Sequence, residues 1–403
     1  MNDQTKQILM IVAFIGSILL IGAGLYFAFF RGVIETPPEE IVAPPATETP
    51  DLPTAGEGSP IPVAPGAGVS LADTVAQGRE TQTTTLTSSA VSNTAVSGNQ
   101  VNYYDANDGR FYQIDDQGNV ISLSEQQFPQ AENVVWNGDA NKAIIEFPDG
   151  SNIVYDFATQ QQVTLPKHWQ DFDFSDSSDQ IVAKNMAVDP DNRWLVTSNA
   201  DGSNVKAVQA LGLNADKVQV SWSPSNKVIA FADTAEPLSG GLDRKMILPI
   251  GQNHENYKGL IIEGLGFLPN WSPDGRQLLY SASGAYSGEK PLLWIVDASP
   301  ATMGENRRSL GLNTWADKCT FTSNSEAYCA VPQNLPTNAG FQRTLYRNLP
   351  DNLYQVDLAT GRTSLLAIPT QNLAMENLTV SGDGRTLYFT DAVSGQLSSL
   401  KLK

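Results

Sequence analysis

The chain is poor in the residues from which metal and redox sites are most often built. Its 403 residues include only two cysteines and two histidines. A zinc-ligand set such as paired C-x-x-C cannot be assembled from that inventory. We therefore expect neither a metal ion nor another cofactor.

Basic residues are scarce as well. Lys and Arg number 25 against 43 Asp and Glu, which gives a formal net charge of −18. The phosphates of a nucleic acid would be repelled by such a surface, so the composition excludes nucleic acid as a partner.

Recognisable catalytic motifs are missing too. No G-x-S-x-G pentapeptide occurs in the chain, although hydrolases with a nucleophile elbow require one. Neither His168 nor His254 has a Ser, Cys or acid at motif spacing, so general acid–base catalysis is not indicated. We expect the chain not to be an enzyme. A carboxylate pair brought together from distant segments stays open, because the sequence does not show which acids meet.

The chain contains instead a repeated hairpin. Residues 271–282 read WSPDGRQLLYSA, in which Pro and Asp-Gly predict a turn between two antiparallel strands. Further copies begin with an apolar residue, which we call the head of the repeat. Ser, Thr or Asn follows in second place, and Asp, Asn or Ser stands in fourth place. The seven heads are Val96, Trp136, Phe174, Trp222, Trp271, Phe321 and Val380.

The spacing of the heads predicts the fold. Successive heads lie between 38 and 59 residues apart, which is typical of β-propellers with four strands per blade. We expect an all-β, seven-bladed propeller whose head aromatics pack between blades. The last blade would supply only three strands, so residues 81–87, TQTTTLT, are predicted to pair there and cover the open edge.

The units at 271–282 and 222–233 (WSPSNKVIAFAD) resemble the WD-repeat-like units of TolB-type propeller proteins. This resemblance implies a propeller that binds other proteins at the cell envelope. Prolyl-oligopeptidase-type enzymes carry similar units, but this chain lacks their hydrolase motif. It also differs from TolB-type proteins at the N-terminus, where they have a cleaved signal and a small α/β domain.

Residues 8–30 form an uncharged apolar run. As a helix it would span about 35 Å, enough for a hydrocarbon core of about 30 Å. A cleaved signal peptide is the alternative, but its apolar region is shorter and ends at small residues. Nine prolines follow within residues 36–65, which predicts an extended, solvated segment.

We therefore divide the chain into four parts. Residues 1–7 are expected to be a cytoplasmic tail, 8–30 a transmembrane helix, 31–78 a disordered Pro-rich linker and 79–403 the propeller. The propeller would lie on the extracytoplasmic side of the cell membrane, held by a single-pass anchor.

An acidic run, DFDFSDSSD at 171–179, invites two interpretations. It could bind a cation, or it could be a solvated turn. Strand alternation would place Asp171 and Asp173 on one face, away from the phenylalanine rings. The run also lacks the Gly and Glu of an EF-hand loop, which favours the turn.

The predicted connections between second and third strands are uneven. They expand to 234–244, 284–290 and 332–351 in blades 4 to 6, with a lesser expansion at 186–192 in blade 3. All emerge on one face of a propeller, so they form one sector. The alternative is that these surface loops vary in length without a function. The aromatic and Arg residues in them, however, are typical of protein interfaces. The candidate binding residues are Arg244, Tyr286, Lys290, Phe341, Arg343, Tyr346 and Arg347.

The functional expectation is a non-enzymatic module that binds an envelope protein or an anionic polymer. Two alternatives stay open. One is a propeller hydrolase or lyase acting on an envelope polysaccharide or peptide. The other is an assembly scaffold or spacer.

Cys319 and Cys329 flank the turn of blade 6 symmetrically about Asn324. Residues so placed face each other on paired strands, close enough for a bridge. We expect a disulfide, with two buried thiols as the alternative.

Overall fold

The computed structural model describes residues 14–17, 19–22, 72–176, 179–239 and 243–403. The chain divides into two units, Met1–Gly68 and Val69–Lys403. The described strands all lie in the second unit.

The predicted membrane anchor is not supported. Within the described part of the chain, no helix is both long and apolar enough to cross a bilayer. The described helical residues near the N-terminus are 14–17 and 19–22, about 6 Å of helix each against a hydrocarbon core of about 30 Å. The rest of 8–30, and residues 31–71 of the predicted linker, lie outside the described residues.

The prediction of a single-pass anchor, with the propeller on the extracytoplasmic side of a cell membrane, is therefore wrong. An uncharged run shows only that a segment could enter hydrocarbon. A span also requires a continuous helix of about 20 residues.

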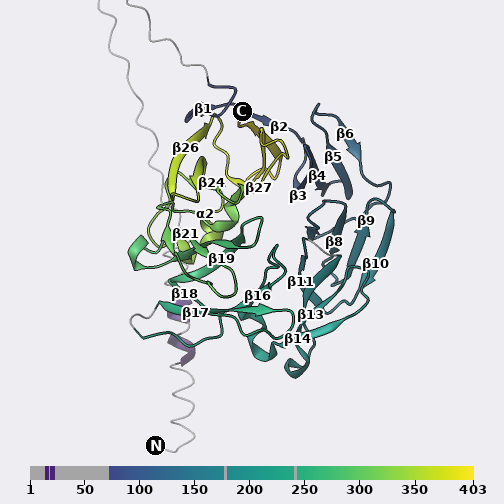
Figure 1. Ribbon diagram of the computed structural model, residues 1–403, viewed down its shortest axis with the longest axis vertical. Coiled ribbons are helices and arrows are strands. Elements are labelled where there is room, and N and C mark those ends of the chain that lie inside the picture. The colour runs from purple at the N-terminus through teal and green to yellow at the C-terminus, as the bar shows by residue number, and fades with distance from the viewer. Residues whose placement is uncertain (1–13, 18, 23–71, 177–178, 240–242) are drawn as a thin grey trace, which may run out of the picture. The chain divides into compact units, whose positions relative to one another are not determined.

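Seven sheets follow one another along the chain and close into a ring, so the predicted seven-bladed propeller is confirmed (Figure 1). Each blade is numbered here in chain order, with its innermost strand first. Blade 1 contains β3 (Val91–Ser97), β4 (Gln100–Asp105), β5 (Arg110–Ile114) and β6 (Val120–Ser122). Blade 2 contains β7 (Asn133–Trp136), β8 (Lys142–Glu146), β9 (Asn152–Asp156) and β10 (Gln161–Leu165). Blade 3 contains β11 (Trp169–Phe174), β12 (Gln180–Asn185), β13 (Trp194–Asn199) and β14 (Lys206–Ala210).

The remaining blades follow the same order. Blade 4 contains β15 (Val218–Val220), β16 (Val228–Ala232), β17 (Arg244–Gly251) and β18 (Leu260–Glu263). Blade 5 contains β19 (Leu265–Trp271), β20 (Gln277–Ser283), β21 (Pro291–Asp297) and β22 (Arg308–Ser309). Blade 6 contains β23 (Cys319–Ser323), β24 (Glu326–Pro332), β25 (Asp351–Asp357) and β26 (Arg362–Pro369). Blade 7 contains β27 (Met375–Val380), β28 (Thr386–Asp391) and β29 (Leu397–Lys401).

The repeated hairpin owes its shape to the hydroxyl in its second position. In blade 5, the Ser272 hydroxyl accepts from the backbone N–H of Gln277 at 2.9 Å and donates to the Asp274 carboxylate at 2.8 Å. Blade 7 repeats both bonds around Ser381. Gly275 closes the turn of blade 5 with a φ of +63°, which glycine adopts without strain. In these two blades the Ser and Asp of the repeat therefore hold the turn.

The apolar heads pack between blades, as predicted. Trp271 of blade 5 stacks on Phe231 of blade 4 with ring centroids 5.4 Å apart. Trp136 of blade 2 packs edge-on against Phe111 of blade 1 at the same distance. The second strands are buried on both faces; β16, which reads VIAFA, is buried throughout. The core is thus a ring of interfaces between neighbouring sheets.

A strand from the N-terminal side of the propeller completes blade 7. Strand β2 (Thr83–Thr85) pairs antiparallel with β29, which confirms the predicted closure by an N-terminal strand. A strand that was not predicted, β1 (Arg79–Thr81), pairs parallel with β26 and makes blade 6 five-stranded. The N-terminal segment is therefore attached to two adjacent blades, as the position of β1 and β2 beside the C-terminus shows (Figure 1).

Ordered contacts begin before the expected propeller boundary at residue 79. Ala76 is buried in the cluster between blades 6 and 7 and donates its N–H to the Lys401 carbonyl at 2.9 Å. The Gly78 N–H donates to Leu366 at 2.7 Å. Residues 72–78 thus belong to the propeller and not to the linker.

Progressive N-terminal truncation should separate the two attachments. A chain beginning at Ser88 lacks β1 and β2, and we expect its Tm to fall by about 5 °C or more relative to one beginning at Ala72, because an edge of blade 7 is exposed. A chain beginning at Gln82 keeps β2 and should melt between them. Differential scanning calorimetry measures the Tm of all three chains. An equal Tm for the chains that begin at Ser88 and Ala72 would contradict closure by β2.

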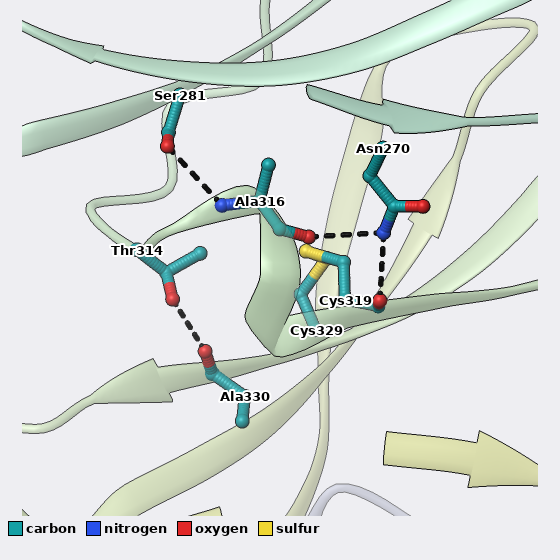
Figure 2. Close-up of a disulfide and its surroundings, with 7 residues drawn as sticks. All are labelled: Asn270, Ser281, Thr314, Ala316, Cys319, Cys329 and Ala330. Carbon is teal, nitrogen blue, oxygen red and sulfur yellow. Dashed lines mark hydrogen bonds between the residues drawn. A yellow bond between two sulfur atoms is a disulfide. The ribbon is translucent and has the colours of Figure 1, made fainter. Parts of the chain in front are cut away.

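The two cysteines form a disulfide at the joint of blades 5 and 6 (Figure 2). They are directly opposed on β23 and β24, the register expected from their placement about Asn324. The Asn270 side chain of blade 5 donates to the Ala316 and Cys319 carbonyls at 3.0 and 2.9 Å. The bridge therefore lies beside the hydrogen bonds that attach blade 6 to blade 5.

The oxidised protein should contain no thiol that reacts with an alkylating agent under denaturing conditions. Intact mass without and with reductant measures this directly. Because the closed loop is short, the Cys319→Ala, Cys329→Ala double variant should lose about 2–3 kcal/mol of unfolding free energy. Two alkylated cysteines in the unreduced protein would show that the bridge is absent.

Candidate binding surface

The second-to-third links of all seven blades lie at one end of the propeller and differ widely in length. Because blade strands run antiparallel, the links between second and third strands and the links between blades emerge at the same end, which we call the loop face. The second-to-third links span 233–243, 284–290 and 333–350 in blades 4 to 6, and 186–193 in blade 3. Those of blades 1, 2 and 7 span 106–109, 147–151 and 392–396. The unevenness predicted from the sequence is confirmed.

The blade 6 link is the largest and holds two short helices, η5 (Ala339–Phe341) and α2 (Arg343–Tyr346). It rests on the blade 5 link, because the Gly340 N–H donates to the Glu289 carbonyl at 2.8 Å. A side chain at Gly340 would collide with Ser283. The two links therefore form one continuous surface.

Four predicted binding residues lie in the blade 6 link, but in different settings. Phe341 is 54% exposed. Tyr346 is half-buried and packs with Leu349 beside the buried Trp315. Its ring therefore stabilises the blade 6 link more than it offers a surface to a partner. Arg343 and Arg347 flank Thr344 along one pocket of about 360 Å³.

The other predicted residues are dispersed. The Tyr286 hydroxyl donates to the Glu263 carbonyl at 2.5 Å, and its ring meets Trp294 edge-on. Lys290 lines a separate pocket of about 380 Å³ between blades 5 and 6. Arg244 is half-buried, and its Nε is buried without a hydrogen-bond partner among the described residues. The seven residues thus do not converge on one site.

Two of the four basic candidate residues, Arg343 and Arg347, are paired with acids of the same chain. Arg343 forms an ion pair with Asp317 and covers the ring of Trp315 at 5.4 Å. Arg347 forms an ion pair with Glu376 at 2.6 Å, and that hydrogen-bonded contact raises the pKa of Arg347. Both guanidinium groups are oriented by acids that the sequence did not connect with them.

Beneath this pocket lies a buried ion pair that sequence reasoning missed. Lys318 Nζ lies 2.7 Å from the Asp351 carboxylate, and both side chains are at most 4% exposed. Asp351 Oδ2 also accepts the Met375 N–H at 2.7 Å, which connects blade 6 to blade 7. Burial raises the pKa of Asp351 to about 6, although Lys318 acts in the opposite direction. In the sequence, Lys318 is distinguished only by its position in the repeat, three residues before the head Phe321.

Exposed apolar side chains gather at the loop face. Nine large apolar side chains of the described propeller are exposed, and six of them lie in links of this face. The six are Val188, Leu213, Tyr286, Phe341, Leu345 and Val393. Val188 and Leu213 are 98% and 80% exposed, in links of blade 3 whose short helices touch each other. Sequence reasoning found only the two aromatics, because an isolated Val or Leu in a loop gives no pattern.

The acidic run of blade 3 does not converge on one point. Asp171 takes a φ of +54° in a β-bulge and forms an ion pair with Lys184 at 2.6 Å. Asp173 turns toward blade 4, where it accepts the Trp222 N–H at 2.7 Å. The bulge breaks the strict alternation expected from the sequence. His168 and His254 lie at opposite ends of the propeller, in a link between blades and in the β17–β18 link.

Asp173 should make stability depend on pH. Burial raises its pKa to about 6, whereas an unfolded Asp has a pKa of about 3.9. The folded chain therefore binds the extra proton, and this contribution is present below about pH 4 and lost as the pH rises through 6. Asp173→Asn cannot titrate. Between pH 4 and pH 6, the unfolding free energy of the wild type should fall by up to about 2–3 kcal/mol relative to that of the variant, as measured by chemical denaturation. If the unfolding free energies of the two proteins change in parallel with pH, the raised pKa of Asp173 is contradicted.

Six four-stranded sheets and one five-stranded sheet close into a ring, and the hairpin heads repeat in each of them. Together these features define the protein as a seven-bladed β-propeller with WD-like repeats. No family model and no curated protein matches the chain. Solved structures share the fold at low identity. An oligogalacturonate lyase in complex with manganese is 15% identical, with a TM-score of 0.55 over 80% of this chain and 93% of that one.

Two further structures show that the fold is shared among different proteins. The Cps50 (Swd1) β-propeller domain of Myceliophteria thermophila is 13% identical, with a TM-score of 0.53 over 79% of this chain and 98% of that chain. The β-propeller domain of the Trilobed protease from Pyrococcus furiosus is 14% identical, with a TM-score of 0.50 over 77% and 95%. At these identities the likeness establishes the fold alone.

Proposed function

We propose that this propeller is a non-catalytic binding module that engages a protein partner through its loop face. The observation that carries the proposal is the gathering of six of the nine exposed large apolar side chains of the described propeller at one end. Exposed apolar groups that share one face are typical of protein interfaces. The links of blades 3, 5, 6 and 7 contribute them.

The charges of this face favour a protein over an anionic polymer. A polymer site needs cations that are free to pair with the ligand. Arg343 and Arg347 are each paired with an acid of the same chain, and the net charge of −18 opposes a polyanion at longer range. An apolar surface with neutralised polar groups suits a protein partner better.

Two other functions were left open by the sequence. One is a lyase or hydrolase, but the oligogalacturonate lyase of similar structure supports only the fold of this chain, not its activity. Incubation of the purified protein with oligogalacturonate and Mn²⁺ checks this alternative, because a lyase makes an unsaturated product that absorbs in the ultraviolet. A pure scaffold or spacer would not need exposed apolar links at one end.

The test places a charge in the apolar surface. Leu213→Asp and Leu345→Asp should each weaken partner binding by about tenfold or more, since a desolvated charge costs at least about 1.4 kcal/mol. Both positions are exposed, so the fold should be unaffected. The measurement is quantitative pull-down from extracts of the source cells, followed by titration of the purified partner.

Val205→Asp is the matched control. Val205 is also exposed, but it lies in the β13–β14 link at the opposite end. A partner that is retained by both loop-face variants would refute the proposal, as would one lost equally with Val205→Asp.

A further inference from the structure

A pocket of about 420 Å³ lies between blades 3 and 4. Strand β14, the outermost of blade 3, lines one side, and residues 248–251 of β17 line the other (β14 and β17 in Figure 1). Thr234, in the loop-face link of blade 4, and the β17–β18 link at the opposite end of the propeller also contribute to its walls. The volume is in the range of small-molecule sites in proteins.

The pocket lies where the outer strand of blade 4 covers only half of its neighbour. Strand β18 pairs with β17 over residues 244–247, so among the described strands none pairs with the outer edge of residues 248–251. Pro249 stands in this uncovered half, and it has no N–H to donate to an added strand. A compact ligand therefore suits the pocket better than an extended peptide that would continue the sheet.

Much of the lining is apolar. Val208, Leu211 and Val218 line the pocket and are each at most 4% exposed. They belong to one packed cluster, against which Leu248 and Ile250 of β17 also pack. The side chains are thus held in place by the interface of the two blades, and they offer a preformed surface to the hydrocarbon part of a ligand.

One carboxylate, that of Glu255, is fixed in the wall formed by the β17–β18 link. It accepts the backbone N–H of Asn253 at 2.8 Å and the side-chain amide of the same residue at 3.0 Å. A side chain at Gly251 would collide with this carboxylate, so the glycine permits its position. Burial acts to raise the pKa of Glu255, but the hydrogen bonds from Asn253 prevail and lower it. The carboxylate is therefore ionised at neutral pH.

The charge of Glu255 has no cation beside it. No Lys or Arg is among the described residues that line the pocket, and Lys258 of the same link forms an ion pair with Glu305 at 2.8 Å. Asn253 occupies two of the roughly four acceptor positions of the carboxylate, so others are open to a ligand. The net charge of −18 attracts a cation at longer range and repels an anion.

We propose that this pocket binds a small organic amine, in which one ammonium group is carried on an apolar body. The ammonium donates to Glu255, and the apolar body packs against Val208, Leu211 and Ile250. A cavity of about 150 Å³ already holds benzene, so this pocket has room for one aromatic ring and a short aminoalkyl chain. The site is an activity beyond the proposed function, because it uses none of the exposed apolar side chains of the loop face.

The test compares three probes that share one apolar body and differ in the charge of the head group. Phenethylamine carries a cation, phenethyl alcohol is neutral and hydrocinnamate carries an anion. Their Kd values for the whole chain are measured by saturation-transfer NMR at pH 8, where imidazoles are neutral and alkylamines are protonated. The amine should bind about fivefold more tightly than the alcohol, as expected for a partly exposed charge pair, and hydrocinnamate should bind most weakly.

Two variants locate the site, and each has a matched control. Glu255→Gln keeps an oxygen for Asn253 but removes the charge, so it should weaken the amine by about fivefold and leave the alcohol unchanged. Ala210→Phe fills the pocket from an exposed position of its lining and should weaken every probe by about tenfold or more. The controls are Glu125→Gln, an exposed acid of blade 1, and Ala207→Phe, which is exposed on β14 but outside the lining. Neither should change a Kd.

Several outcomes would overturn this site. An amine that binds no more tightly than the alcohol, or whose Kd is unchanged by Glu255→Gln, would contradict recognition of a cation. Absence of binding, or equal loss in Ala210→Phe and Ala207→Phe, would contradict the location. Acetyl-lysine methylamide is a fourth probe; tighter binding of this probe than of phenethylamine would replace the free amine by a lysine side chain of a protein. None of these results bears on the loop face, which is tested by binding of a protein partner.

Discussion

Closure of the ring is the constraint on which the rest of the propeller depends. Each blade buries its faces only against its neighbours, so the ring is complete only if the first and last blades meet. Here the last blade has three strands of its own, and β2 provides the fourth by pairing with β29. Strand β1 attaches the same segment to blade 6. The unpaired edge that would otherwise invite association is thereby covered.

A closed ring also explains how the two ends of the propeller differ. The first-to-second hairpin turns lie at one end, where Ser and Asp side chains hold the turns of blades 5 and 7. The opposite end carries links whose length is not set by the hairpin, and there the chain places exposed apolar groups, α2 and a buried Lys318–Asp351 pair. A rigid ring with one variable face is well suited to binding, because the links are held by the strands on both sides.

The candidate surface was only partly predictable. The uneven links and the exposed Phe341 could be inferred, since strand lengths and aromatics leave a pattern in the sequence. The partners of Arg343 and Arg347 could not, because Asp317 precedes Arg343 by 26 residues and Glu376 follows Arg347 by 29. Such pairs depend on how blades are juxtaposed. The predicted anchor failed for a related reason: hydropathy along the chain does not establish a continuous helix.

By itself, the sequence determined the number of blades, the position of each hairpin, the pairing of a strand within residues 81–87 with the last blade and the opposition of Cys319 and Cys329. These follow from local turn chemistry and strand alternation, which repeat along the chain. Only the tertiary structure decided the attachment of β1, the bulge at Asp171, the burial of Asp351 against Lys318 and the pocket beside Arg343 and Arg347. Except for the bulge, which lies within blade 3, those features arise where blades meet, and contacts between distant segments leave no periodic signal.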